Sequence, residues 1–221
     1  MIRAVVFGIG ECLIDQTREF GEWADWLGVP RHTFAAQFGA VVAQGRDHSE
    51  TFQVFRPGFD IAEERAKREA CGKQEWYGEN DLYPDVRLAL KELRSAGLWI
   101  GIAGNHTAHI GQVLRVMFAG HVHMAATSGD FGVAKPDPRF FERIVAHTGY
   151  EPEEVLYVGD RLDHDVIPAA AVGLRTALLA RGPWGVIHQH HPDAHRLPTM
   201  RLTSLRQIVA RVAEYNTVTA A

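Results

Sequence analysis

From Pro84 onward, short apolar segments alternate with amphipathic segments, and the connections between them are short. The apolar segments predict strands, and the amphipathic segments predict helices. Strands and helices that alternate in this way form a parallel sheet with helices on both faces, so we predict an α/β fold. The predicted strands are residues 98–103, 123–127, 154–158 and 175–179, and the predicted helices are 84–96, 108–118, 137–147, 163–172 and 205–215.

Residues 4–7 predict one more buried strand, which ends in a loop that starts at Gly8. In the following segment of about sixty residues, apolar residues occur at helical spacing, and no segment clearly predicts a strand. We therefore predict a core domain of residues 1–15 and 84–221, with a helical domain of residues 16–83 inserted in the chain. Most aromatic residues of the insert would form its interior, and some would line an apolar substrate pocket.

Composition restricts the partners of the chain. Apolar residues make up 46% of the sequence, which is enough to fill a globular core. The 23 basic and 27 acidic residues give a net charge of −4 without a basic cluster, so we expect no nucleic-acid partner. No apolar run reaches about 18 residues and the start resembles no secretory signal, so we expect a cytoplasmic protein without a membrane span. The sequence leaves the oligomeric state open.

Three carboxylates follow the predicted strand 154–158, namely Asp160, Asp163 and Asp165. Ligands of open parallel sheets bind at the carboxyl ends of the strands, and carboxylates suit a hard cation such as Mg2+. Asp163 fits the cap of the next helix equally well, so Asp160 and Asp165 are the predicted metal ligands. Lys135 precedes another predicted helix and could reach an anion at this edge, although a surface lysine is the simpler interpretation.

These segments resemble the motifs of the haloacid dehalogenase (HAD) superfamily. Gly159-Asp160 with Asp165 resembles motif four, and residues 135–138 resemble motif three. Residues 102–105 resemble motif two, and residues 5–15 resemble motif one by position and apolar pattern. The resemblance implies a Rossmannoid three-layer core, with residues 16–83 as a type 1 helical cap. It also implies a phosphatase-type hydrolase whose ligand is a small phosphorylated or acidic molecule.

Motif one departs from the family pattern. In the family its first Asp is the nucleophile and its second Asp is a general acid and base. Here Gly8 and Gly10 hold those positions, and Gly104 stands where motif two normally offers a hydroxyl group. The resemblance therefore implies that this chain is inactive, or nearly so, as a classical phosphatase. It also implies weakened Mg2+ binding, because one carboxylate of the metal shell is absent.

Other residues offer replacements for the missing groups. Glu11 suits acid/base chemistry, and His106 suits either a proton transfer or a ligand contact. Cys12 is a further candidate nucleophile in the same loop. The predicted catalytic residues are Lys135, Glu11 and His106, and the predicted substrate-binding residues are Asn105, Lys135, Trp23 and Arg56.

Two other functions stay open at this point. In one, the site is redirected to acid/base chemistry of a lyase or cyclase type, with the substrate in the pocket of the cap. Alternatively, the chain is a non-catalytic binding or scaffold protein that uses the fold alone. Whether the chain is an enzyme is therefore not decided by the sequence.

Overall fold

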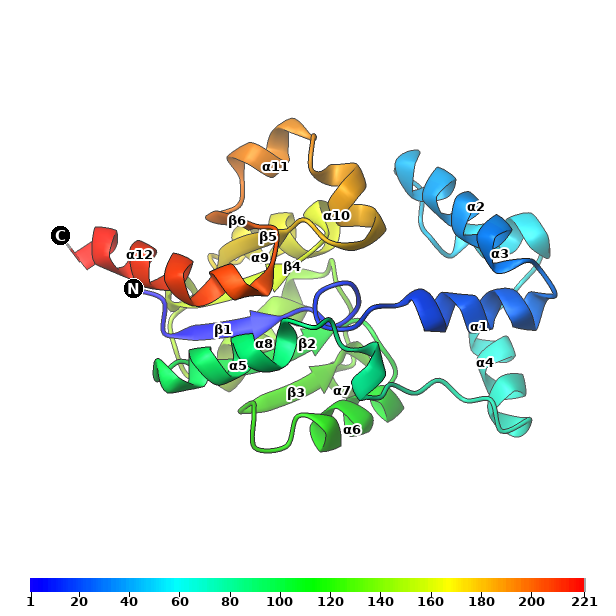
Figure 1. Ribbon diagram of the computed structural model, residues 1–221, viewed down its shortest axis with the longest axis horizontal. Helices are drawn as coiled ribbons and strands as arrows, with labels where there is room; N and C mark the ends of the chain where they lie inside the picture. The colour runs from blue at the N-terminus through cyan, green and yellow to red at the C-terminus, as the bar shows by residue number, and fades with distance from the viewer. Residues whose placement is uncertain (221) are drawn as a thin grey trace. The chain divides into compact units, whose positions relative to one another are not determined.

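The computed structural model describes residues 1–220, which form two compact units (Figure 1). The first, which we call the core unit, consists of Met1–Asp15 and the chain from Gly78 onward. The second is Gln16–Tyr77, which we call the helical unit. The sequence predicts the boundary at residue 83, yet residues 78–83 lie in the core unit. The backbone N–H groups of Asp15 and Tyr83 explain this, because they donate to Asp81 and Leu13 carbonyls at 2.8 and 3.0 Å.

The core unit contains a six-stranded parallel sheet in the order β3-β2-β1-β4-β5-β6. The strands are β1 Ala4–Phe7, β2 Trp99–Gly104, β3 Met124–Thr127, β4 Val155–Gly159, β5 Arg175–Leu179 and β6 Met200–Leu202. This confirms the predicted α/β fold, and the three-residue edge strand β6 is an addition to it. Since β1 lies between β2 and β4, the loops that follow these three strands share one edge of the sheet.

The helices of the core unit follow the predicted alternation. They are α5 Val86–Ser95, α6 Ala108–Met117, α7 Ser128–Phe131, α8 Pro138–Thr148, α9 Ile167–Ala171, α10 Gly182–His188, α11 Pro192–Arg196 and α12 Ile208–Ala220. Short helical turns are η1 Glu79–Asp81, η2 Pro152–Glu154, η3 Leu162–Val166 and η4 Leu205–Gln207. The helix predicted over 163–172 is divided into η3, a π-helical turn, and α9. Turns of this kind occur frequently at functional sites.

Helices cover both faces of the sheet (Figure 1). On one face, Ala4 and Val6 of β1 pack in a buried cluster with Phe140 and Phe141 of α8. On the other face, α5 packs against α12. All four residues of β1 are buried, which explains why this strand is continuously apolar in the sequence rather than alternating.

The helical unit is built from four helices around aromatic side chains. The helices are α1 Thr17–Leu27, α2 Arg31–Ala43, α3 Glu50–Phe55 and α4 Ile61–Ala70. The ring of Phe52 lies 5.5 Å from that of Trp23 and 4.8 Å from that of Phe59, between ring centroids. Asp60 caps α4 by accepting hydrogen bonds from the backbone of Ala62 and Glu63. Aromatic packing thus holds together a unit that contains helices of only 6 to 13 residues.

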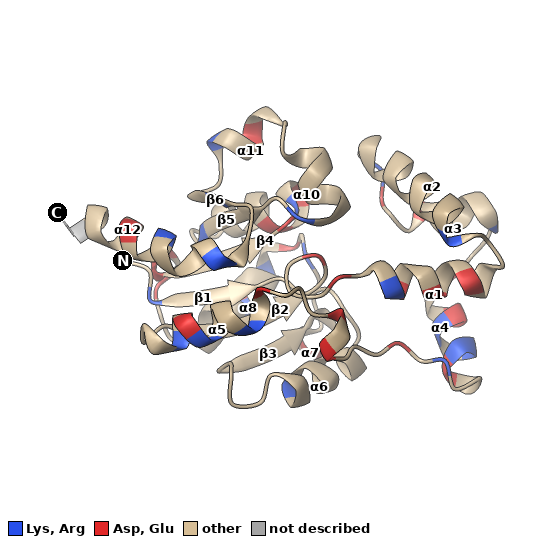
Figure 2. Ribbon diagram, viewed as in Figure 1, with Lys and Arg blue, Asp and Glu red and all other residues tan. Residues whose placement is uncertain are grey.

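Charge is distributed without large areas of one sign along the helices that cover the core. Basic and acidic residues are interspersed on α5 and α12 (Figure 2). Among the described residues, no helix combines the length and the apolar character that crossing a membrane requires.

Candidate active site at the carboxyl edge of the sheet

The predicted site residues of the core unit come together because three neighbouring strands end at one edge. Gly8 follows β1, Asn105 follows β2, and Asp160 follows β4. The segment that precedes α8 brings Lys135 to the same edge, where its ammonium group meets Asp165 of η3. Residues that are far apart in sequence therefore form one polar cluster, as the sequence predicts.

Lys135 and Asp165 form a buried ion pair. The Lys135 Nζ and Asp165 Oδ1 atoms are 2.5 Å apart, and the side chains are only 9% and 1% exposed. The second oxygen of Asp165 accepts the backbone N–H of Arg161 at 2.9 Å. A Cβ atom on Gly159 would lie 2.3 Å from the Asp165 carboxyl carbon, so this position requires glycine. Both oxygens of Asp165 are thus engaged and its place is fixed by packing.

Asn105 holds the backbone of Lys135. Its side-chain amide donates to the Lys135 carbonyl at 2.9 Å, and its amide oxygen accepts the Lys135 N–H at 2.8 Å. These two bonds use both ends of the amide group. The geometry therefore favours Asn105 as a positioning residue for Lys135, and its predicted contact with substrate stays a prediction.

Asp160 is the unusual carboxylate of the cluster. It is 4% exposed, and its Oδ2 atom has no hydrogen-bond partner among the described residues. Burial, and next the charge of Asp165, raise the pKa of Asp160 well above its ordinary value. A buried polar atom without a partner is costly, and a hard divalent cation with oxygen ligands would satisfy it. The donor set therefore fits Mg2+, for which Asp160 is the better available of the two predicted ligands.

Gly8, which follows β1, has open space around its Cα atom. Its N–H donates to the Val158 carbonyl at 2.8 Å, which joins the loop to β4. A Cβ atom on Gly8 would have its nearest neighbours at 3.5 to 3.7 Å, which is ordinary van der Waals contact. The backbone at this position therefore leaves room for a Cβ atom.

Gly104, at the end of β2, is in a different situation. A Cβ atom there would lie 3.0 to 3.2 Å from three side-chain carbons of Ile9. Ile9 is itself 3% exposed. The side chain of Ile9 thus occupies the space next to Gly104.

Cys12 lacks the environment of a reactive thiol. It is fully buried, and its Sγ lies 3.5 Å from the Val158 carbonyl oxygen. Burial, with a smaller contribution from Asp160, raises the pKa of the Cys12 thiol well above its ordinary value. Because the thiolate is the nucleophilic form, this environment argues against Cys12 as a nucleophile at neutral pH.

Glu11 occupies an unusual place in the same loop. Its φ angle is 54°, and it is the one non-glycine residue with positive φ in the described chain. Glu11 is 6% exposed, and its carboxylate accepts a hydrogen bond from the Tyr83 hydroxyl at 2.5 Å. A Cβ atom on Gly182 would lie 2.5 Å from a Glu11 carboxylate oxygen. Two other segments of the core unit thus enclose this side chain.

The sequence pattern does not reveal these surroundings of Glu11. It places Tyr83 in the insert, and it does not mark Arg181 or Gly182, which follow a strand at the carboxyl edge of the sheet. The guanidinium of Arg181 donates to the Cys12 carbonyl at 3.0 Å and lies 4.1 Å from the Tyr83 ring centroid. It also pairs with Asp85 at 2.5 Å.

The remaining predicted site residues have partners of their own. The ring of His106, in the core unit, accepts the backbone N–H of Thr107 at 3.0 Å. In the helical unit, Trp23 is 1% exposed, which favours a packing role. Arg56 donates to Glu64 at 3.3 Å. Substrate contacts by these three residues stay predictions.

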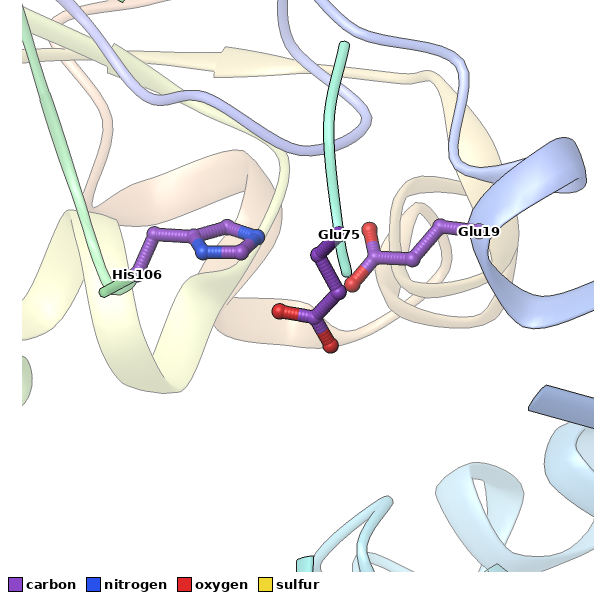
Figure 3. Close-up of side chains that lie close together, drawn as sticks. All are labelled: Glu19, Glu75 and His106. Atoms are coloured by element: carbon purple, nitrogen blue, oxygen red, sulfur yellow. The ribbon is translucent and has the colours of Figure 1, made fainter. Parts of the chain in front are cut away.

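The helical unit also contains an acidic pair. Figure 3 shows Glu19 and Glu75, which belong to this unit, together with His106 of the core unit. Carboxylate oxygens of the two glutamates lie within 4.8 Å of each other. The Tyr77 hydroxyl donates to Glu19 at 2.5 Å, and the Trp23 indole donates to Glu75 at 3.2 Å. These two hydrogen bonds thus offset part of the repulsion between the two carboxylates.

Comparison with known proteins is consistent with this geometry. A family model described as haloacid dehalogenase-like hydrolase matches residues 2–173. Glyceraldehyde 3-phosphate phosphatase of Methanopyrus kandleri is 31% identical over 134 residues, which are 60% of this chain and 57% of that protein. Phosphoserine phosphatase of Thermus thermophilus is 32% identical over 130 residues, 58% and 49% of the two chains. The chain thus matches about half the length of these curated relatives.

The fold has solved counterparts over its whole length. The crystal structure of β-phosphoglucomutase from Clostridium difficile superposes with a TM-score of 0.68 and covers 100% of both chains. The sequence identity is 15%, so this similarity concerns the fold alone.

Proposed function

Because this chain belongs to the haloacid dehalogenase-like hydrolase family, we propose that it binds a small phosphorylated or acidic molecule at the carboxyl edge of its sheet. The observation that carries the proposal is the buried pair of Lys135 and Asp165, whose charges act on Asp160. The Oδ2 atom of Asp160 is buried and has no hydrogen-bond partner among the described residues. The names of two matched relatives, both phosphatases of small phosphorylated molecules, support the same ligand class.

Each residue of the site has a proposed task. Lys135 would attract the anionic group of the ligand, with its backbone fixed by Asn105 and its ammonium group fixed by Asp165. Asp160 and Asp165 would hold Mg2+, which when bound supplies charge neutralisation next to a phosphate group. Glu11 and His106 are the groups proposed to hold or transfer a proton. Trp23 and Arg56 remain proposed contacts in the helical unit.

The same proposal states that the chain is inactive, or nearly so, as a classical phosphatase. Gly8 has no side chain that could attack phosphorus, and the buried Cys12 thiol does not replace it. Loss of a covalent nucleophile lowers the rate of a hydrolase by about a million-fold where this has been dissected. Ligand binding by the remaining residues does not depend on that step.

A redirected acid/base enzyme is the second candidate function. It is favoured by the enclosed carboxylate of Glu11, which no family role explains, and by the apolar contact of Ile9 with Gly104. Such an enzyme, of a lyase or cyclase type, would use Glu11 to take a proton from its substrate. A non-catalytic binding protein is the third candidate function.

The test is a phosphate-release assay in Mg2+ over a panel of small phosphate esters. It compares the natural chain with Gly8→Asp and with Gly8→Asn, which is the matched control because it adds the same volume without a carboxylate. We expect release by Gly8→Asp alone. Release by the natural chain at a similar rate would contradict the proposed inactivity. No release by any of the three would remove support for the phosphatase-type site and would direct screening to apolar ligands.

A further inference from the structure

The helical unit contains a cavity of its own. Its volume is about 460 Å3, which is within the range of small-molecule sites in proteins. The cavity is bordered by α1, by the end of α4 and by the segment that follows α4, and its charged and aromatic lining residues are Glu22, Asp25, Trp26, Arg68, Lys73 and Trp76. All of these residues belong to the helical unit, so the cavity is built without any residue of the core unit.

Two tryptophan side chains line this cavity. Tryptophan is highly buried on average, yet Trp76 is 51% exposed. The guanidinium group of Arg18 lies 4.2 Å from the centroid of the Trp76 ring. The Trp26 indole donates to a carboxylate oxygen of Glu64 at 2.6 Å, which fixes this second ring. The cavity thus offers flat aromatic surface to a ligand.

Arg68 is a buried cation with an unused hydrogen-bond donor. The residue is 3% exposed, and its Nη2 atom donates to Glu22 at 3.1 Å. Its guanidinium group lies 4.3 Å from the centroid of the Trp23 ring. Its Nη1 atom is buried and has no hydrogen-bond partner among the described residues. A buried N–H group without an acceptor is costly, and a carboxylate matches the planar guanidinium group well.

The two acidic residues of the lining already have arginine partners. Glu22 accepts hydrogen bonds from Arg18 at 2.6 Å and from Arg68 at 3.1 Å. Asp25 accepts two hydrogen bonds from Arg31, at 3.1 and 2.6 Å. The negative charges of the lining are therefore engaged, and they do not use the Nη1 donor of Arg68.

Lys73 adds a second cation to the lining. Its Nζ atom lies 5.8 Å from the centroid of the Trp26 ring, which is within the range of a cation–π contact. Its side chain makes no ion pair or hydrogen bond within the described part of the chain. An anion in the cavity would thus meet an ammonium group that no carboxylate binds directly.

We propose that this cavity binds a small aromatic acid, with the ring of the ligand against Trp26 and Trp76 and its acidic group bound by Arg68 and Lys73. The inference goes beyond the proposed function and does not rest on it, because every residue of this site belongs to the helical unit. No covalent bond is made or broken at the site. Charge-assisted hydrogen bonds and aromatic contact hold the ligand.

Binding of naphthoate to the full chain tests the proposal. Isothermal titration and ligand-detected NMR compare naphthoate with naphthalenemethanol, which keeps the ring without the charge, and with acetate, which keeps the charge without the ring. We expect binding of naphthoate alone at millimolar concentration. Equal binding of the alcohol would overturn the anionic character of the ligand, and a failure of naphthoate to bind would overturn the site itself.

Variants of two exposed lining residues locate the binding. Lys73→Met should weaken the affinity for naphthoate about fivefold, because a charge-assisted contact is lost. Trp76→Ala should weaken it about tenfold, because one aromatic wall is lost. Lys67→Met is the matched control, since it removes a lysine of the same unit that does not line the cavity and pairs with Glu63 and Glu64. The control should change the affinity less than about twofold.

The affinities of these variants can also overturn the proposal. Unchanged affinity in both Lys73→Met and Trp76→Ala would mean that naphthoate binds elsewhere. A loss in Lys67→Met as large as in Lys73→Met would mean a general effect of charge. Arg68→Lys keeps the charge but removes the unused donor, so it should weaken binding in a chain that circular dichroism shows to be folded. Lys73 and Trp76 are exposed, so their variants test the site even where Arg68→Lys does not fold.

Discussion

The loops that follow β4 and β1 face the same ligand edge but are built in opposite ways. After β4, Asp165 has a partner for each oxygen, and Gly159 leaves room for it. After β1, Gly8 has no side chain, Ile9 is buried next to Gly104, and Glu11 has a positive φ angle. The comparison teaches that the loop after β4 holds its carboxylate by paired charges and hydrogen bonds, whereas the loop after β1 is shaped by glycines and by close packing.

Removal of Lys135 should have the largest effect. Lys135→Met leaves the carboxylate of Asp165, which is 1% exposed, without its cation. Loss of one partner of a buried pair costs about 3–5 kcal/mol. Urea denaturation in the presence of EDTA measures the free energy of unfolding. Arg139→Met is the control, because Arg139 pairs with Asp137 while 74% exposed and should change stability little. A small effect of Lys135→Met would remove the contrast between the two loops.

Gly182→Ala tests the enclosure of Glu11. The new Cβ atom would lie 2.5 Å from the Glu11 carboxylate, and the φ angle of +65° at this position adds strain. Overpacking of this kind costs about 1–3 kcal/mol. In a chain that also carries Glu11→Gly, the destabilisation caused by the contact with the Glu11 side chain should disappear. The effects of the single and double variants on thermal unfolding should therefore be strongly non-additive. Additive effects would mean that the absence of a side chain at Gly182 is not needed to make room for Glu11.

Gly104→Ala tests the adaptation between Gly104 and Ile9. The added Cβ atom would meet Ile9 carbons at 3.0 to 3.2 Å, so we expect a loss of about 1 kcal/mol. Ile9→Ala in the same chain should relieve that contact. Gly8→Ala is the control, since its Cβ atom has no neighbour nearer than 3.5 Å. Chemical denaturation that ranks Gly8→Ala as the more harmful change would contradict this description of the loop.

Asp163→Asn should have the smallest effect, and one that depends on pH. Burial alone would raise the pKa of Asp163, but the hydrogen bond and charge of Arg161 outweigh it and lower the pKa from 3.8 to about 2. The carboxylate therefore stabilises the fold above pH 3.8, and that contribution is lost as pH falls toward 2. Because the side chain of Asp163 is half exposed, screening by solvent keeps this contribution to stability below about 1 kcal/mol.

Unfolding curves of the natural chain and Asp163→Asn at several pH values measure this difference. The two chains should differ slightly at pH 5 and converge near pH 2. A gap that grows as pH falls would contradict the assigned pairing of Asp163 with Arg161.

The sequence by itself determined the parallel α/β fold and the placement of Lys135, Asp160 and Asp165 at one edge, since apolar period and chain order fix where strands end. Only the tertiary structure decided the boundary at Tyr77, the engagement of Asn105 with Lys135, and the enclosure of Glu11 by Tyr83 and Gly182. These features depend on contacts between segments far apart in the chain and on a single φ angle. Long-range contacts and single backbone angles produce no periodic pattern in the sequence, so the sequence cannot predict them.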